Sequence, residues 1–266
     1  LAVPVTGHPG QGWAIPAVVT PGAWGHAMTF DIARSAAERH TGQDLIKWIA
    51  LLTMVLDHMR LAWPASSDLF VLGRLSFPLF CLAVAINVSR NQPGEIFTRS
   101  NGRYLASLVV FAALSEVPYR LVSTSGTFNV LVTLALGLLV AWGVQHRTLE
   151  SLVMAGGAIL AGYLLSEPLM YGFYGVFVPA ALVLAIKRPE LFALLPVALC
   201  VTVNSRTGLF EQAAQLEPFA VLALLIAALA PLLGLALFWA RLPFKILPVT
   251  QWSYWFYPGH LLAMLG

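Results

Sequence analysis

Charged side chains are scarce in this sequence. Its 266 residues include 15 Lys and Arg and 12 Asp and Glu, which is 10% of the chain, against roughly 25% in an ordinary soluble domain. So few charges cannot cover the surface of a soluble protein of this size, and 59% of the residues are hydrophobic. The composition therefore excludes a soluble globule and a disordered chain, and it indicates a protein whose main solvent is lipid.

Cysteine and excess charge are also in short supply. Cys81 and Cys200 are the two cysteines, and both lie in apolar runs without a CxxC partner or a His at metal-ligand spacing, so neither a disulfide scaffold nor a metal site is expected. The formal net charge is only +3 and the basic residues are scattered. This excludes the concentrated basic surface that binds nucleic acid.

Long apolar runs are abundant, and turn-forming segments such as 91–94 and 123–126 separate them. A membrane-spanning helix needs about 20 largely apolar residues. The sequence predicts an all-α fold, a polytopic helical bundle with eight or nine transmembrane helices that forms one domain over residues 44–266. The expected helices lie near 44–62, 69–89, 103–122, 128–145, 149–166, 171–186, 190–204, 218–240 and 251–266.

The basic residues predict an orientation in the membrane. When loops are assigned alternately to two sides, Arg60, Arg120 and Arg206 fall on one side, and Lys47 and Arg74 fall within helices. The side of the N-terminus collects Arg34, Arg39, Arg90, Arg99, Arg103, Arg147, Lys187, Arg188, Arg241 and Lys245. Because cytoplasmic loops are enriched in Lys and Arg, the N-terminus is expected in the cytoplasm.

The first 43 residues are expected to form a separate cytoplasmic segment. Residues 1–27 contain no Lys, Arg, Asp or Glu, so no positive region marks a secretory signal. We interpret residues 1–27 as an extension upstream of a native start at Met28.

Ionisable residues within predicted spans are the first candidates for function, since each costs about 2.5–3.5 kcal/mol in mid-membrane on insertion scales. Asp57 and His58 lie late in the first helix, where the alternative is a wet helix end. Arg74 precedes Pro78, which frees the Arg74 carbonyl and predicts a kink there. An arginine suits a carboxylate, a phosphate or an oxyanion; the alternative is an ion pair with Asp57 or Glu116.

Further candidates each carry a structural alternative. Glu116 is spaced to pair with Arg120, and Asn129 stands where a helix N-cap is expected. The tyrosines can be interface anchors, whereas His260 is a second histidine within an apolar run. By the expected orientation all candidates fall in the outer leaflet, which predicts one cavity there. The candidates are Asp57, His58, Arg74, Glu116, Asn129, Tyr171, Tyr174, Tyr257 and His260.

Several motifs together resemble the TraX family, in that family's order and from about residue 44 to residue 266. They are residues 49–58 ending in Asp57-His58, Gly73-Arg74-Leu75-Ser76-Phe77-Pro78, Ser115-Glu116-Val117-Pro118, Asn129 to Gly137, Tyr171-Gly172-Phe173-Tyr174-Gly175 and Phe256-Tyr257-Pro258-Gly259-His260-Leu261. The resemblance implies a multi-pass inner-membrane protein of a conjugation system. Its implied activity is acetylation of the N-terminal amine of pilin with acetyl-CoA as donor.

The resemblance also implies roles for the candidates. His58 is expected to be the general base, with Asp57 setting its tautomer directly or through a neighbour. Arg74 and Asn129 are expected to hold the donor or the oxyanion, and Glu116 to orient Arg74 or the substrate ammonium. His260 is expected to be a second base or a transient acetyl carrier, which would pass acetyl from cytoplasmic acetyl-CoA to an outer acceptor. Tyr171, Tyr174 and Tyr257 are expected to line the substrate site.

Three alternatives remain open at this point. Intramembrane Asp, His, Arg and Glu are also used by proton-coupled transporters, although no internal repeat is evident in the sequence. A non-catalytic partner in pilus assembly would use the same residues structurally. A membrane acyltransferase with a glycan or lipid acceptor would keep the chemistry and change the substrate.

Overall fold

A computed structural model of the protein describes residues 22–240 and 242–265, and it describes side chains from residue 41 onward except those of residues 62, 64 and 241. The chain divides into residues 1–37 and a compact unit of residues 38–266. The prediction about residues 1–27 lies outside the described side chains. The helices are α1 (Gly22–Ala62), η1 (Pro64–Ser66), α2 (Leu69–Gly73), α3 (Ser76–Ser89), α4 (Arg99–Val122), α5 (Val130–His146), α6 (Leu149–Leu164), α7 (Gly172–Gly175), α8 (Val178–Lys187), α9 (Pro189–Phe192), α10 (Leu194–Thr202), η2 (Ser205–Thr207), α11 (Leu209–Ala214), α12 (Pro218–Trp239) and α13 (Trp252–Ala263).

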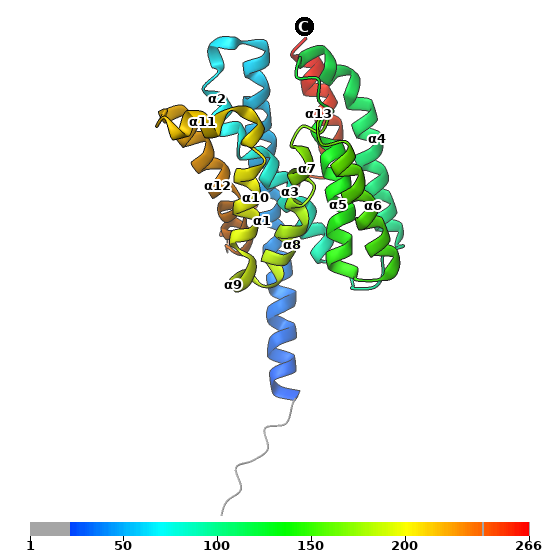
Figure 1. Ribbon diagram of the computed structural model, residues 1–266. Coiled ribbons are helices and arrows are strands. Elements are labelled where there is room, and N and C mark those ends of the chain that lie inside the picture. Colours follow the sequence, from blue (N-terminus) through cyan, green and yellow to red (C-terminus); the bar gives the residue numbers. More distant parts are fainter. Residues whose placement is uncertain (1–21, 241, 266) are drawn as a thin grey trace, which may run out of the picture. The chain divides into compact units, whose positions relative to one another are not determined.

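Every regular element in these ranges is helical (Figure 1), which confirms the all-α prediction. The nine expected segments all coincide with helical regions, but three of them are each divided into two helices: 69–89, 171–186 and 190–204. Helix α11 and the two 3₁₀ turns were not expected. Apolar runs therefore predict where helices lie better than where they break.

The structure supports a membrane protein but does not confirm eight or nine spans. Within the described part of the chain, three segments are long and apolar enough to cross a membrane: Leu69–Ser89, Arg99–Val122 and Pro218–Trp239. Val130–His146, Leu149–Leu164 and Gly172–Lys187 are apolar but shorter. At 1.5 Å per residue, the 17 residues of α5 rise about 26 Å, less than the roughly 30 Å of a hydrocarbon core.

Helix α12 shows which surface meets lipid. Most of its buried residues are small, namely Ala220, Ala223, Ala227, Ala230 and Gly234, and the larger Pro231, Leu235 and Phe238 are buried near its end. Its outward residues are large and exposed, namely Leu222, Leu225, Leu229 and Leu233. A helix in water places its leucines inward, whereas small residues at helix contacts are typical of membrane proteins. The exposed leucines are therefore a lipid-facing stripe.

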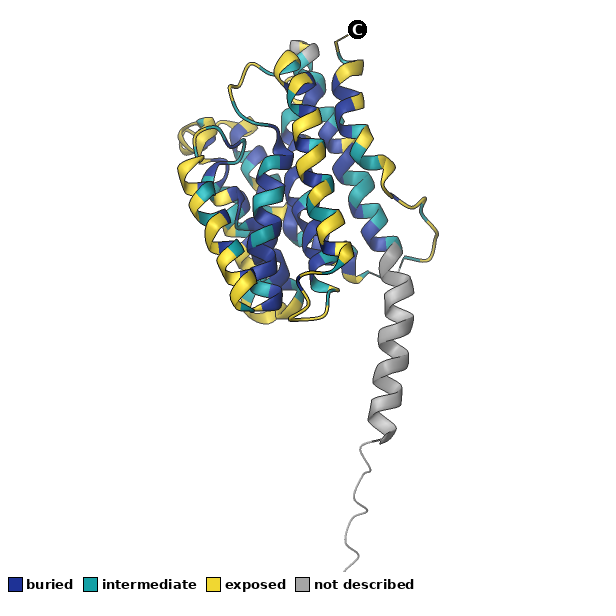
Figure 2. Ribbon diagram, turned by 90° about the vertical axis from the view of Figure 1, so that its right-hand side faces the viewer, coloured by how far each residue is buried: buried dark blue, intermediate teal, exposed yellow. Residues whose placement is uncertain are grey.

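A matching apolar stripe lies on α4, where Val110, Leu114, Val117 and Leu121 are exposed at spacings of three and four. Figure 2 shows the contrast between the exposed outer helix faces and the buried interior of residues 41–265. A soluble monomer rarely exposes apolar patches of this extent. The two stripes therefore agree with the low-charge composition.

The interior of the unit is built on α3, α5 and α8, which pack on one another (Figure 1). Gly137 on α5 permits the close approach, because a Cβ there would lie 2.7 Å from Cγ of Pro179 on α8. Nearly all of α3 is buried, from Ser76 through Val88. These three helices form the framework against which the site helices are placed.

The unit has two ends with different loops (Figure 1). The end that we call the histidine end holds the loops 63–68, 123–129, 165–171 and 203–208, together with the end of α13. The other end, which we call the basic end, holds the loops 90–98, 147–148 and 188, and the segment 242–251.

Candidate functional site

Two histidines meet inside the histidine end. His58 on α1 and His260 on α13 are 202 residues apart, yet Nδ1 of His58 lies 2.7 Å from Nε2 of His260. The rings are stacked, with centroids 5.0 Å apart and planes 13° from parallel. Both side chains are buried. A buried polar pair needs mutual hydrogen bonding to be tolerated, so this contact defines the arrangement of both rings.

The second nitrogen of His260 fixes the direction of that hydrogen bond. Nδ1 of His260 lies 3.0 Å from the carbonyl oxygen of Phe256, and a carbonyl oxygen can only accept. Nδ1 of His260 therefore carries the proton, and in a neutral ring Nε2 accepts from the Nδ1–H of His58. The remaining nitrogen, Nε2 of His58, then carries an unprotonated lone pair.

Contacts at the basic end align α13 with α1. Nζ of Lys47 donates to the carbonyl of Val249 (3.0 Å), and the backbone N–H of Val249 donates to Asp44 (3.1 Å). Trp48 and Trp252 are in ring contact, with centroids 5.4 Å apart. Because α13 starts from this anchored position, His260 comes to lie beside His58.

Aromatic rings enclose the histidine pair. Phe256 stacks on His260 at 5.5 Å, and Tyr257 is tilted against His58 at 6.2 Å and His260 at 5.5 Å. Tyr257 is buried and also lines a second, largely apolar cavity of about 260 Å³, whose lining extends to Lys47 and Val249 at the basic end. The pair is thus shielded by apolar surface.

Asp57 faces two arginines. Among the described hydrogen bonds, none joins Asp57 to either histidine. Its Oδ1 accepts from Nε of Arg60 at 3.2 Å and lies 3.6 Å from Nη2 of Arg74. Gly73 permits this approach, since a Cβ at that position would lie 2.5 Å from Oδ1 of Asp57. The sequence predicted that Asp57 sets the His58 tautomer directly or through a neighbour; in the structure the direct hydrogen-bond partner of His58 is His260.

Arg74 is held from three directions. It is buried, its Nη1 donates to Oδ1 of Asn204 at 2.9 Å, and its guanidinium lies 3.9 Å from the ring centroid of Phe70. Asn204 is itself fixed, because its Nδ2 donates to the carbonyl of Cys200 at 2.8 Å. The ion pair with Asp57, named above as one structural alternative for Arg74, is present at 3.6 Å, and no pair between Arg74 and Glu116 is found among the described residues.

Arg74 reaches this position because the helix breaks there. Helix α2 ends at Gly73 and α3 begins at Ser76, where the sequence predicts a kink four residues before Pro78. Pro78 lies in the first turn of α3, a position that needs no backbone N–H. The break turns the chain so that Arg74 points between α1 and α10.

A cavity of about 320 Å³ adjoins these groups, and we call it the histidine cavity. Its lining includes Asp57, His58, Arg60, Arg74, Tyr119, Tyr171 and the hydroxyl residues Ser123, Thr124, Ser125, Thr127 and Thr207. Two arginines face one carboxylate, so one positive charge is in excess. Such a cavity favours an anion or a developing oxyanion.

Tyr171 contributes a wall of the histidine cavity. Its ring stacks on Phe77, with centroids 3.7 Å apart and planes 11° from parallel. The loop before it is held by Arg206, which donates to the carbonyl of Ser166 (2.6 Å) and to the carboxylate of Glu167 (2.7 Å). Tyr171 is thus placed by packing and by a braced loop. Tyr174, predicted alongside it, is half exposed and lines neither the histidine cavity nor the apolar cavity.

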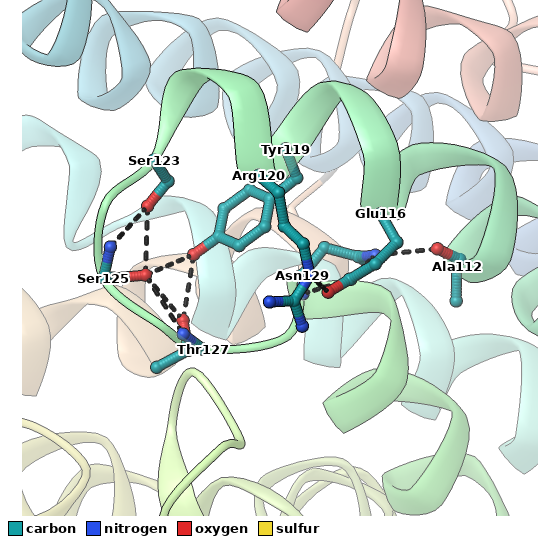
Figure 3. Close-up of polar contacts among 8 residues, drawn as sticks. All are labelled: Ala112, Glu116, Tyr119, Arg120, Ser123, Ser125, Thr127 and Asn129. Atoms are coloured by element: carbon teal, nitrogen blue, oxygen red, sulfur yellow. Dashed lines mark hydrogen bonds and ion pairs between the residues drawn. The ribbon is translucent and has the colours of Figure 1, made fainter.

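Glu116 and Asn129 join α4 to α5 (Figure 3). Oε2 of Glu116 accepts from the backbone N–H (3.1 Å) and Nδ2 (2.8 Å) of Asn129, and Oε1 accepts from Nε of Arg120 (2.7 Å). Asn129 also donates to the carbonyl of Ala112 (2.7 Å) and caps α5 by accepting from Leu131. The Glu116–Arg120 pair and the N-cap, both named as alternatives, are present, and neither Glu116 nor Asn129 lines the histidine cavity.

The loop that these contacts support does reach the cavity. The hydroxyl of Tyr119 lies 3.0 Å from Oγ of Ser125 and 2.9 Å from Oγ1 of Thr127 (Figure 3). All three residues line the histidine cavity. The Glu116 network therefore acts on the site through the loop 123–129.

Sequence reasoning missed three residues that hold the site. Asn204 positions Arg74, Arg60 shares Asp57, and Arg206 braces the loop before Tyr171. The run Asn204-Ser205-Arg206-Thr207 between two strongly apolar helices was a signal, because such a run is unusual in this composition.

Comparisons with known proteins bear on identity. A sequence profile of the TraX protein family matches residues 42–266. Protein TraX of Escherichia coli is 44% identical over 50 residues, which is 18% of this chain and 20% of that protein, so the chain spans about a fifth of that curated relative in this match. Comparison with solved structures gives no match. Because the profile covers far more than half of the sequence, the chain belongs to the TraX protein family.

Proposed function

We propose that the protein is an integral-membrane acetyltransferase that transfers acetyl from acetyl-CoA to the N-terminal amine of a pilin subunit in a conjugation system. One observation carries the proposal: the hydrogen bond from His58 to His260 leaves an unprotonated Nε2 on a histidine that lines a cavity. A positioned imidazole is the commonest general base. Membership in the TraX protein family supports the same reading.

The chemistry follows from the neighbouring groups. The amine nitrogen attacks the thioester carbonyl carbon, Nε2 of His58 takes the proton that the amine loses, and the carbonyl oxygen becomes an oxyanion. The buried guanidinium of Arg74 stabilises that charge. When the C–S bond breaks, the thiolate of CoA takes the proton from His58, and an amide and a free thiol result.

In this scheme His260 is a positioning residue. Its Nε2 accepts from His58 whether His58 is neutral or protonated, so it orients the ring throughout the reaction. Because both nitrogens of His260 are already hydrogen-bonded, a transient acetyl group would reside on Nε2 of His58. Asp57 serves by holding Arg74 and Arg60.

The proposed orientation places the basic end in the cytoplasm and the histidine cavity toward the outer face of the inner membrane. Loops rich in Lys and Arg are retained on the cytoplasmic side. A processed pilin held in the membrane would present its new N-terminus on the outer side. Cysteines placed at position 124 and position 147 should be labelled from opposite sides; labelling of position 124 from the cytoplasm would contradict this orientation.

The test is mass spectrometry of a candidate pilin co-expressed with the protein. Wild type should add one acetyl group to the pilin N-terminus, and His58→Ala should lower the rate by about 10²–10⁴-fold. His146→Ala is the matched control, because His146 is also a buried histidine at a helix end but does not line the histidine cavity. Undiminished acetylation by His58→Ala would overturn the assignment of the base.

A hydroxyl acceptor on a glycan is the second candidate, and the histidine cavity supplies the reason. Five Ser and Thr side chains line it on the side of the loops, and hydroxyls are suited to hydrogen bonding with a polyol. The base and the oxyanion group would be the same. Labelled acetate that appears in envelope glycans, with the pilin unmodified, would favour this acceptor.

A further inference from the structure

Arg60 is the more exposed of the two arginines in the histidine cavity. It stands two residues before α1 ends at Ala62, and its side chain is 32% exposed, against 8% for Arg74. His58, two residues earlier on α1, is buried. Both residues line the histidine cavity. A molecule that enters this cavity from solvent can therefore contact Arg60 while its reacting atom lies at His58.

The two guanidinium groups lie against one aromatic ring. Cζ of Arg60 is 5.0 Å and Cζ of Arg74 is 3.9 Å from the ring centroid of Phe70. Between them stands one carboxylate, because Oδ1 of Asp57 lies 3.2 Å from Nε of Arg60 and 3.6 Å from Nη2 of Arg74. Asp57 is the one acidic residue among the described residues that line the cavity. A second anion would offset the charge that Asp57 leaves unbalanced.

Both arginines keep donors for a ligand. Nε of Arg74 is buried and has no hydrogen-bond partner among the described residues, which suits Arg74 to the oxyanion of the proposed reaction. Arg60 uses Nε for Asp57, and among the described residues no hydrogen bond or ion pair engages its Nη1 or Nη2. The terminal edge of a guanidinium is the edge that binds a carboxylate with two parallel hydrogen bonds.

The charge of the cavity makes a demand on an amine acceptor. An N-terminal amine has a pKa of about 7.7–8.0 and is therefore largely a cation near neutral pH. A cavity with an excess of positive charge repels that cation. A carboxylate on the same acceptor removes the repulsion, because Arg60, Arg74, Asp57 and the added carboxylate sum to zero. A phosphomonoester, at about −1.5 to −2, would leave the cavity negative.

We propose that Arg60 binds a side-chain carboxylate that the acceptor carries within a few residues of its N-terminal amine. The inference rests on the proposed acetyl transfer and names the class of acceptor that the same cavity takes. Arg60 is then a specificity-determining residue. It holds the acidic side chain at the more exposed part of the cavity, while the amine reaches Nε2 of His58.

The test compares acceptors that differ in one charge. Full-length protein in phosphatidylcholine nanodiscs is given acetyl-CoA and tetrapeptides with amidated C-termini, which carry Asp or Asn at the second or the third position. Wild type should favour the Asp peptide of at least one pair about tenfold in kcat/KM, mainly through KM, as expected for one charge-assisted hydrogen bond. Equal kcat/KM within both pairs would overturn the inference.

Arg60→Gln should reduce this preference to about one, and Arg60→Lys, which keeps the charge and loses the planar edge, should retain part of it. The preference compares two peptides on the same protein, so a smaller folded fraction does not alter it. Arg120→Gln is the matched control, because Arg120 pairs with Glu116 one turn earlier on its own helix, as Arg60 does with Asp57, but does not line the cavity. It should keep the tenfold preference. A preference that survives in Arg60→Gln would show that Arg60 does not bind the carboxylate.

A third peptide tests the charge balance. A phosphoserine in place of the Asp should give a lower kcat/KM than the Asp peptide, because the second negative charge exceeds what the two arginines and Asp57 leave unbalanced. A phosphoserine peptide that reacts faster than the Asp peptide would show that the site takes a dianion, and the assignment to a carboxylate would be wrong.

Binding without acetyl-CoA separates this inference from the proposed function. If the Asp peptide binds more tightly than the Asn peptide by equilibrium dialysis, in a manner that depends on Arg60, and no acetylated product forms with acetyl-CoA, this site is supported and the transfer reaction is not. If both peptides are acetylated with equal kcat/KM and the rate depends on His58, the reaction is supported and this site is overturned.

Discussion

The two ends of residues 38–266 treat their charges in opposite ways. At the histidine end, each of the basic residues Arg60, Arg120 and Arg206 is paired with a carboxylate, at 3.2, 2.7 and 2.7 Å. At the basic end, basic residues outnumber acidic ones among the described side chains. The basic residues are Lys47, Arg90, Arg99, Arg103, Arg147, Lys187, Arg188 and Lys245, and the acidic residues are Asp44, Glu95, Glu150 and Glu190. The charges of the first end therefore hold its structure together, whereas the described part of the second end carries an excess of positive charge.

The difference in charge pairing suits the two ends to different tasks. Paired charges hold loops and side chains in fixed positions, which a reaction centre requires. An excess of positive charge attracts anions and retains loops on the cytoplasmic side of a membrane. We therefore expect substitutions at the histidine end to change rate, acceptor binding and stability, and substitutions at the basic end to change orientation in the membrane.

The largest effect should come from the histidine pair. His260→Ala removes the acceptor that orients His58, so acetylation should fall about 100-fold. In a His58→Ala background the same change should cost almost nothing further, because residues that act as a unit are strongly non-additive. The acetylation rates of wild type, His58→Ala, His260→Ala and the double variant, measured by mass spectrometry, form a double-mutant cycle. Additive losses would show that the two histidines act independently.

Arg74→Ala should have the next largest effect, on stability as well as rate. It leaves Asp57 facing Arg60 alone and removes the partner of Asn204, and breaking a buried pair costs about 3 kcal/mol. Arg60→Ala is the comparison, since Arg60 is about one-third exposed and its loss should cost less than about 1 kcal/mol. Thermal unfolding in detergent micelles, followed by tryptophan fluorescence, measures both. Equal shifts in Tm would contradict the distinction.

Loss of a helix cap should cost more stability at the histidine end than at the basic end. Asn129→Ala at the histidine end removes the cap of α5 and two hydrogen bonds to α4, and it should lower the free energy of unfolding by about 2 kcal/mol. Thr148→Ala at the basic end removes only a local cap of α6 and should cost about 1 kcal/mol. Denaturant titration of the two variants provides the comparison, which fails if Thr148→Ala is the more damaging.

The smallest effect should come from Tyr174. Its side chain is half exposed and lines neither the histidine cavity nor the apolar cavity, so Tyr174→Phe should change stability by less than about 0.5 kcal/mol and leave acetylation unchanged. Tyr171→Ala, which removes a stacked wall of the histidine cavity, should lower the acetylation rate. A loss of acetylation in Tyr174→Phe would show that Tyr174 is part of the site.

The positions of helices were predictable because the signals are local. Apolar runs and breaks such as Asn91-Gln92-Pro93-Gly94 lie within a few residues of the structure they determine. The number of spans was less predictable, because the expected helices over 171–186 and 190–204 are each divided into two. Length alone does not reveal where the backbone turns inside an apolar run.

The site was predictable in its residue types and less so in its contacts. Ionisable side chains cost free energy within a membrane, and this cost indicated Asp57, His58 and Arg74 as candidates. The structure brings these three residues to one cavity. The partner of His58 lies 202 residues away, and no periodicity connects positions so distant. Whether Tyr171 or Tyr174 faces inward depends on α7, which has only four residues, too few for a helical pattern to settle the orientation.

The sequence separation of the two histidines has a consequence for biosynthesis. Chains are made from the N-terminus at about 5–20 residues per second, so His260 follows His58 by roughly 10–40 seconds. During that interval α2 through α12 and most of α13 are made, but His58 lacks the neighbour that sets its tautomer. For the proposed reaction, the base would be oriented only when α13 docks, so acetylation would report completed assembly. A ribosome stalled before α13 would leave a membrane-inserted but inert protein.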